Sequence, residues 1–186
     1  MRDPKRVAIL ISGRGSNMRA LVENAGAYQV VLIASNKAEA AGLEWARGRG
    51  LPIWVLESKG LGKEEFDRKL SAALDEHGVG TVALAGFMRI LSPWFVSEWH
   101  GRILNIHPSL LPKYRGLDTH ARALEAGDAV SGCSVHVVTE ELDAGALLGQ
   151  IEVPVETGDT PETLEQRVLA AEHQLYPRVL SEFVKR

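Results

Sequence analysis

Apolar and polar positions follow two patterns along the chain: short runs rich in β-branched residues, and longer stretches with helical spacing. Residues 7–12 (VAILIS) and 30–35 (VVLIAS) are apolar at nearly every position, which predicts strands buried on both faces of a sheet. Residues 63–77 instead place Phe66 and Leu70 one helical turn apart, which predicts an amphipathic helix. The predicted strands are 7–12, 30–35, 53–56, 79–85, 103–106, 134–138 and 147–155. The predicted helices are 17–25, 40–49, 63–77, 93–101, 119–127 and 161–185, with Ser92 and Thr160 as caps of the fourth and the last.

Strands and helices alternate over the whole chain, without repeats or low-complexity segments. This order predicts an α/β fold in which helices flank a doubly wound, mostly parallel sheet. A length of 186 residues fits one domain, so we expect a single domain over 1–186. In such sheets, ligands bind outside the carboxyl ends of the strands, beside the point where the strand order reverses. We therefore expect the site residues in the segments that follow predicted strands.

Composition and charge narrow the class of partner. The 45% apolar and 24% charged content is ordinary for a soluble globular protein, and the net charge of −3 gives no bulk attraction to nucleic acid or to an anionic membrane. We therefore expect small-molecule partners, and the composition leaves open a monomer or a homodimer. The first ten residues hold too short an apolar stretch for a signal peptide, so we expect a cytoplasmic protein.

The cysteine and histidine content argues against a metal site. Cys133 is the single cysteine, which excludes intramolecular disulfides and thiolate-rich metal sites. The histidines show no pair at zinc-motif spacing, so no metal is expected. His120 and His136 could line one cleft, although we interpret both as structural, and His173 could approach it from the last helix.

The glycine-rich turn at 12–17 (SGRGSN) only partly fits a nucleotide-binding motif. The dinucleotide fingerprint requires glycine where this chain has Met18, and an acidic residue where it has SNK at 35–37. Residues 15–17 nevertheless open a helix, and their free amides and hydroxyl suit a single phosphate monoester. A plain strand-to-helix turn is the alternative.

Asn105 and His107 lie at the end of a predicted buried strand and are the strongest candidates for chemistry. Side chains two positions apart on a strand share a face, and Pro108 restricts the backbone of His107. An amide that can donate to a developing oxyanion beside an imidazole that can move protons suits a reaction at a carbonyl. The alternative is a structural histidine in a loop.

Asp143 is the best candidate for a carboxylate that orients this histidine. It lies in the polar segment TEELDAGALL between two predicted strands, where Ala144 and Gly145 permit a tight turn. A carboxylate near the ring would favour the charged imidazolium. The alternative is a solvated acidic turn formed together with Glu140 and Glu141.

Three segments together resemble the folate-dependent formyltransferases. They are AGFMRIL at 85–91, LNIHPSLLPKYRG at 104–116 and ELDAG at 141–145, and the resemblance extends from Val7 to about Phe183. The further segments ISGRGSN, SNK and EHQLYP resemble the branch of the family that acts in purine (IMP) biosynthesis. The resemblance implies a Rossmann-like fold, 10-formyltetrahydrofolate as the formyl donor, the amine of 5-phosphoribosylglycinamide as the acceptor, and no metal.

The resemblance also assigns roles to individual residues. It implies that Asn105, His107 and Asp143 are catalytic. The residues implied to bind the ribonucleotide are Gly15, Ser16, Asn17 and Glu172. The residues implied to bind the folate are Lys63, Met88, Arg89, Ile90, Leu91 and Asn105. The chain departs from the family pattern at three positions. Family members carry arginine at the position of Lys63, and the match also fails at Asp118. At Ala144 a second glycine can occur, and alanine there could stiffen the loop.

The expected reaction is attack of the substrate amine on the formyl carbon, with Asn105 and protonated His107 stabilising the oxyanion and Asp143 holding the histidine. Three alternatives remain at this point. Methionyl-tRNA formyltransferases resemble this chain plus a carboxy-terminal RNA-binding domain, which we do not expect here. Formyltetrahydrofolate hydrolases use the same three residues and carry an extra amino-terminal domain. A non-catalytic nucleotide-binding module is the third alternative, if Asp143 lies far from His107.

Overall fold

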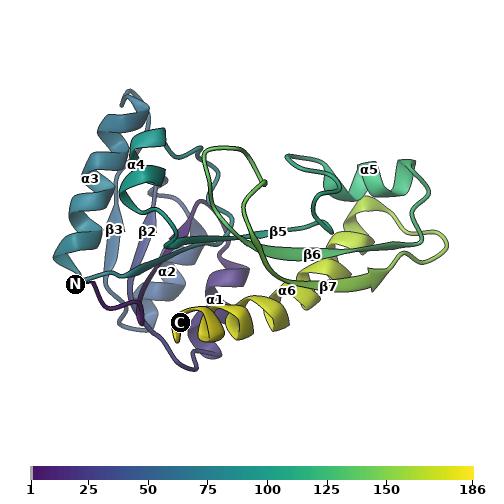
Figure 1. Cartoon of the computed structure of the whole chain (residues 1–186), viewed down its shortest axis with the longest axis horizontal. Coiled ribbons are helices and arrows are strands. Elements are labelled where there is room, and N and C mark those ends of the chain that lie inside the picture. The colour runs from purple at the N-terminus through teal and green to yellow at the C-terminus, as the bar shows by residue number, and fades with distance from the viewer. Residues whose placement is uncertain (1) are drawn as a thin grey trace.

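The computed structural model describes residues 2–186, and it shows a twisted seven-stranded sheet covered by helices (Figure 1). The strands are β1 (Arg6–Ile11), β2 (Gln29–Ser35), β3 (Ile53–Val55), β4 (Thr81–Leu84), β5 (Ile103–His107), β6 (Val130–Val137) and β7 (Leu147–Pro154). The helices are α1 (Ser16–Glu23), α2 (Ala41–Gly48), α3 (Lys63–Glu76), α4 (Pro93–Glu98), α5 (Thr119–Glu125) and α6 (Pro161–Phe183). In the described chain, no helix is long and apolar enough to cross a membrane.

The strand order is β3-β2-β1-β4-β5-β6-β7. Strands β1 to β5 pair in parallel, whereas β6 is antiparallel to both β5 and β7. The order reverses between β1 and β4, so the carboxyl ends of these strands border the expected ligand crevice. The predicted fold class, a doubly wound and mostly parallel sheet, is confirmed.

The apolar runs of the sequence are explained by two cores, one on each face of the sheet. In β1, Val7, Ile9 and Ile11 belong to one buried cluster, and Ala8 and Leu10 belong to the other. Helices α1, α2 and α6 contribute to the first cluster, and α3 and α4 contribute to the second. Because both faces of β1 are buried, both sets of alternating positions must be apolar.

Strand β6 begins at Val130, four positions before the predicted start at 134, so that boundary was wrong. The missed residues include Ser131 and Gly132, which have little intrinsic preference for a strand. They are held in the sheet by pairing with β7, where Gly132 lies opposite Glu152. Tertiary pairing therefore overrides local preference at this end of the strand.

Helix α6 lies along β6 and β7 and also contacts α1 (Figure 1). Its amino terminus has the predicted cap, a capping box between Thr160 and Thr163. The buried hydroxyl of Tyr176 lies 3.0 Å from the carbonyl oxygen of Leu84 and 3.1 Å from that of Leu104. These contacts fix α6 against β4 and β5, and thereby place Glu172, one turn earlier, at the edge of the crevice.

Candidate active site

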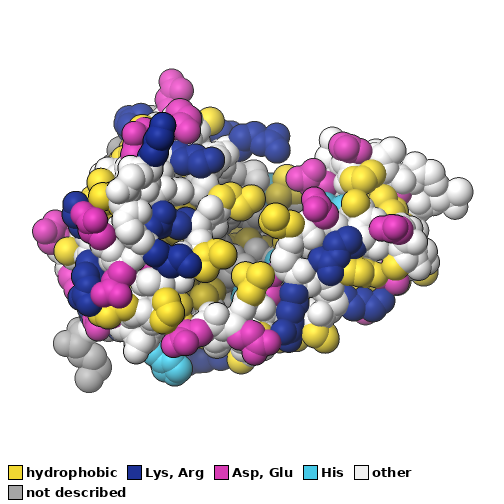
Figure 2. Space-filling view, turned by 90° about the horizontal axis from the view of Figure 1, so that it is seen from above, with side chains coloured by type: hydrophobic (Ala, Val, Ile, Leu, Met, Phe, Trp, Pro, Cys, Tyr) yellow, Lys and Arg dark blue, Asp and Glu magenta, His cyan; other side chains and the backbone are white. Residues whose placement is uncertain are grey.

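A cleft of about 560 Å³ opens at the carboxyl ends of β4 and β5. It is lined by segments far apart in the sequence, among them Asn17, residues 86–88, 105–108 and 116–121, and Glu172. Figure 2 shows the molecule hollowed near its centre, with hydrophobic side chains gathered around the hollow. A second cavity, of about 510 Å³ and lined by Leu110 and Gln150 among others, contains none of the predicted site residues. The first cleft is therefore the candidate active site.

His107, the last residue of β5, is buried with both ring nitrogens facing acceptors. Its Nε2 lies 2.8 Å from the carbonyl oxygen of Tyr114, and its Nδ1 lies 3.4 Å from Oδ2 of Asp143. A carbonyl oxygen can only accept, so Nε2 carries a proton and donates it. Nδ1 faces the Asp143 carboxylate, which can accept a hydrogen bond from that nitrogen when it carries a proton.

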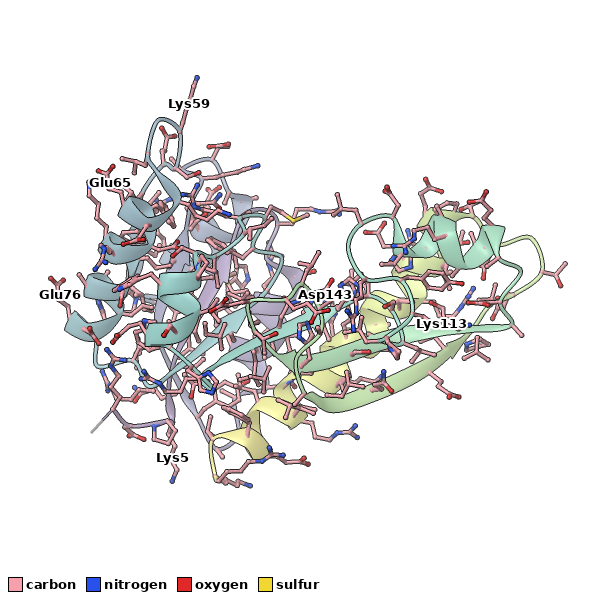
Figure 3. The ribbon with its side chains drawn as sticks, turned by 45° about the horizontal axis from the view of Figure 1, so that its top comes forward. Lys5, Lys59, Glu65, Glu76, Lys113 and Asp143 are labelled. Carbon is pink, nitrogen blue, oxygen red and sulfur yellow. The ribbon has the colours of Figure 1, made fainter. Side chains whose placement is uncertain are left out.

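Asp143 reaches His107 from the loop between β6 and β7, and its side chain is only 7% exposed. Oδ2 accepts a hydrogen bond of 2.9 Å from the backbone N–H of Gly116. Figure 3 shows Asp143 near the centre of the molecule, whereas Glu65 and Glu76 lie at its edge. The 3.4 Å from Oδ2 to Nδ1 is longer than a strong charge-assisted hydrogen bond, so the Nδ1 proton is available to another acceptor in the cleft.

Asn105 lies two residues before His107, and both line the cleft, as expected from the period of a strand. Its Nδ2 lies 3.1 Å from Nε2 of His136, which stands opposite it in the antiparallel register of β6. Burial lowers the pKa of His136; the charge of His107 acts in the same direction, and the Val137 carbonyl and Asp143 oppose it. The structure thus brings Asn105, His107 and Asp143 together, with a second histidine behind the amide.

The sequence does not predict three of these contacts. It favours a structural role for His136, and it gives no sign of the contacts with the Tyr114 carbonyl and the Gly116 amide. Tyr114 has φ 54°, a left-handed backbone conformation that is uncommon outside glycine. The sequence could have pointed to His136 only if the antiparallel pairing of β5 with β6 had been known.

In the glycine-rich turn, Gly15 is the N-cap residue of helix α1 and Ser16 begins the helix. Gly15 has φ 73°, and an added Cβ would meet Cε of Met18 at 2.9 Å and Cα of Gly42 at 3.2 Å. Only glycine fits there without a shift of its neighbours. Of this turn, Asn17 lines the cleft, and the first backbone amides of α1 have no partner within the helix, as at every helix start.

Asn17 and Glu172 form a buried polar pair on the wall of the cleft. Nδ2 of Asn17 donates a hydrogen bond of 2.8 Å to Oε2 of Glu172, and Oδ1 of Asn17 has no partner among the described residues. Burial raises the pKa of the Glu172 carboxyl to about 7, opposed by the Asn17 hydrogen bond and reinforced by Glu165. The pair presents an acceptor to a ligand that can donate, such as a hydroxyl.

The residues proposed for the folate are spread along one rim. Met88 lines the cleft and is 70% exposed, Ile90 is 67% exposed, and Leu91 is buried in the core beneath them. The Arg89 guanidinium lies 4.5 Å from the centre of the Phe66 ring. Lys63, the first residue of α3, is exposed and lies outside the cleft lining.

Two hydrogen bonds fix this rim to the sheet. The backbone N–H of Met88 donates to Oγ of Ser12 over 2.7 Å, and that hydroxyl donates to Oδ1 of Asn36 over 2.6 Å. Ser12 and Asn36 directly follow β1 and β2, so the ends of these strands hold the rim in place. Within residues 2–186, no three His, Cys, Asp or Glu side chains gather so as to hold a metal ion.

Comparison with known proteins assigns the chain to a family. The model of the formyl transferase family matches residues 5–180. The chain is 48% identical to phosphoribosylglycinamide formyltransferase of Escherichia coli, over 95% of this chain and 86% of that protein. It is 47% identical to the human trifunctional purine biosynthetic protein adenosine-3 over 94% of this chain, but it spans only 18% of that protein's length.

Solved structures agree with the sequence comparisons. The crystal structure of phosphoribosylglycinamide formyltransferase from Brucella melitensis superposes with a TM-score of 0.92 at 48% identity, covering 98% of this chain and 96% of that one. The corresponding structure from Anaplasma phagocytophilum gives a TM-score of 0.91 at 44% identity, covering 97% of this chain and 87% of that one. The chain belongs to the formyl transferase family.

Proposed function

We propose that this chain transfers the formyl group of 10-formyltetrahydrofolate to the amine of 5-phosphoribosylglycinamide, a step of purine biosynthesis, and that residues 1–186 act as one formyltransferase domain. The observation that carries the proposal is the buried pair of His107 and Asp143 beside Asn105, in a chain 48% identical to an enzyme named for this reaction. The partners are small molecules, and we place the reaction in the cytoplasm.

The three residues stabilise the charge that develops on the formyl oxygen. When the amine attacks the formyl carbon, that oxygen becomes an oxyanion and accepts from Nδ1 of His107 and from Nδ2 of Asn105. Asp143 offsets the positive charge of the His107 imidazolium. The Tyr114 carbonyl accepts a hydrogen bond from Nε2 and so fixes the orientation of the ring. The proton lost by the amine passes, through His107 or a water, to the departing folate nitrogen.

The two ends of the cleft hold the two substrates. The phosphate of the ribonucleotide binds Gly15, Ser16 and Asn17, because backbone amides at a helix start favour an anion. Glu172, with its acceptor oxygens, binds the ribose and glycinamide portion.

The folate binds along the opposite rim. The exposed apolar side chains of Met88 and Ile90 form its wall, Leu91 supports them from the core, and Asn105 contacts the folate at the formyl group. Arg89 and Lys63 supply positive charge toward the acidic tail of the folate.

Steady-state kinetics test the proposal. Formation of the deformylated folate, followed by absorbance, should depend on 5-phosphoribosylglycinamide, and formylated ribonucleotide should appear in equal amount by mass spectrometry. The matched control is glycinamide riboside, which lacks the phosphate and should be a poor acceptor. Folate turnover without any amine would indicate a hydrolase instead, and absence of turnover with every acceptor would refute the proposal.

A further inference from the structure

A second histidine, His136, lies directly behind the proposed catalytic amide. It stands on β6 opposite Asn105 and is 2% exposed. Its Nε2 lies 3.1 Å from Nδ2 of Asn105, and its Nδ1 lies 3.1 Å from the carbonyl oxygen of Val137. Both ring nitrogens thus lie within hydrogen-bond distance of a polar protein atom.

These two neighbours determine where the proton of His136 sits. The Val137 carbonyl can only accept, so Nδ1 carries the proton. Nε2 then presents a lone pair, which accepts one N–H of the Asn105 amide. The opposite tautomer would direct an Nε2 proton at Asp143, whose Oδ1 is 3.6 Å away and beyond hydrogen-bond range. That tautomer would also set the Nδ1 lone pair against the Val137 carbonyl and the Nε2 proton against the Asn105 amide.

The charge state follows from the same contacts. A doubly protonated His136 could not accept the Asn105 N–H, and the amide would have to turn Oδ1 toward Nε2 to pair with a buried charge. The charged groups that face His136 are Asp143, from the β6–β7 loop, and His107, from β5, and they act in opposite directions. Burial disfavours the charge, and the neutral ring satisfies both of its hydrogen bonds.

We infer that neutral His136, protonated on Nδ1, is a positioning residue that sets the orientation of the Asn105 amide for formyl transfer. By accepting one Nδ2–H, it keeps the amide nitrogen on the side of β6 and leaves the second Nδ2–H free to donate into the cleft. Without that acceptor the amide can rotate by half a turn and present Oδ1, which repels an oxyanion instead of stabilising it. The inference rests on the proposed function, because it is the formyl oxygen that needs the donor.

Two substitutions separate this role from simple packing. His136→Leu removes the acceptor and should lower kcat at least about tenfold, with the KM for the ribonucleotide unchanged within about twofold. His136→Gln places a carbonyl oxygen close to the position of Nε2 and should recover at least half of the lost activity. Equal loss in both variants, or an unchanged kcat in the leucine variant, would overturn the inference.

A double-mutant cycle shows whether His136 acts through Asn105. In an Asn105→Ala background, adding His136→Leu should change kcat by less than about twofold, because the amide to be oriented is already absent. A further tenfold loss in that background would mean that His136 acts independently. Thermal unfolding of each variant controls for lost fold.

A spectroscopic measurement on the wild-type protein does not depend on its activity. Nitrogen-15 chemical shifts of the His136 ring at neutral pH should show a protonated Nδ1 and a bare Nε2. A protonated Nε2 would overturn the inference even if the proposed reaction were correct. Conversely, the expected tautomer in a protein without formyl transfer would refute the proposed function alone.

Discussion

Replacing Asp143 by asparagine removes one charge from the site and keeps nearly all of its shape. The amide oxygen can still accept the Gly116 N–H, which now bonds Oδ2 over 2.9 Å, so the loop should remain in place. What is lost is the attraction between the carboxylate and the His107 ring. The perturbation therefore tests electrostatics more than folding.

The separation of 3.4 Å between Nδ1 of His107 and Oδ2 of Asp143 sets the magnitude. At that distance, two unit charges attract by about 5 kcal/mol at an effective dielectric constant of about 20, and by about 1 kcal/mol in bulk water. The pair is buried but borders an open cleft, so the value lies between these limits. Since about 1.4 kcal/mol corresponds to tenfold in rate, we expect kcat to fall by about 10- to 1000-fold.

The assay is steady-state formyl transfer with both substrates varied. KM values should stay within about threefold, because Asp143 acts on the transition state more than on binding. Glu141→Gln is the matched control, since Glu141 lies in the same loop with a side chain 75% exposed and pairs with Arg115 at the surface. That control should change kcat less than about twofold. An Asp143→Asn enzyme with more than a third of normal kcat, or an equal loss in the control, would refute the electrostatic role.

Three further predictions follow from the rest of the cleft. Ser16→Asp should raise the KM for the ribonucleotide far more than that for the folate, because the added charge repels the phosphate; equal effects on both KM values would argue against a phosphate site there. The carboxyl of Glu172 has its pKa raised from 4.5 to about 7 by burial, so wild-type stability should fall as pH rises between these values. Glu172→Gln should therefore be more stable than wild type by about 3 kcal/mol at pH 8 and by little at pH 4 in urea unfolding, and a constant difference across pH would contradict this. Activity should survive dialysis against EDTA, because the proposed steps use side chains alone; a loss reversed by one particular ion would contradict it.

Local features of the fold could be predicted because they depend on neighbours in the sequence. Strand β1 is apolar at successive positions because it is buried on both faces, by one core on each side. The caps at Ser92 and Thr160 accept hydrogen bonds from backbone N–H groups only three residues further along the chain. The start of β6 could not be predicted, because Ser131 and Gly132 join the sheet only through β7. The strand and helix preferences of neighbouring residues therefore predict most elements. They fail where a segment becomes a strand only because it pairs with another strand.

In the candidate site, too, some contacts could be predicted from the sequence and others depend on tertiary structure. The period of a strand places Asn105 and His107 on one face, so their proximity could be predicted. The contact with Asp143 depends on how the β6–β7 loop returns over β5, and the contact with His136 depends on an antiparallel register. The Tyr114 carbonyl, which bonds His107, is a backbone atom and leaves no signature in the sequence.

The most direct test of the central claim, that His107 performs the chemistry, is single-turnover formyl transfer by His107→Ala with both substrates saturating. The account predicts that the rate of the chemical step falls at least about 100-fold, since both oxyanion stabilisation and proton transfer are lost. Both substrates should still bind with nearly normal affinity, because the phosphate and folate ends of the cleft are untouched. A chemical step within about threefold of wild type, in a variant that binds both substrates, would contradict the account.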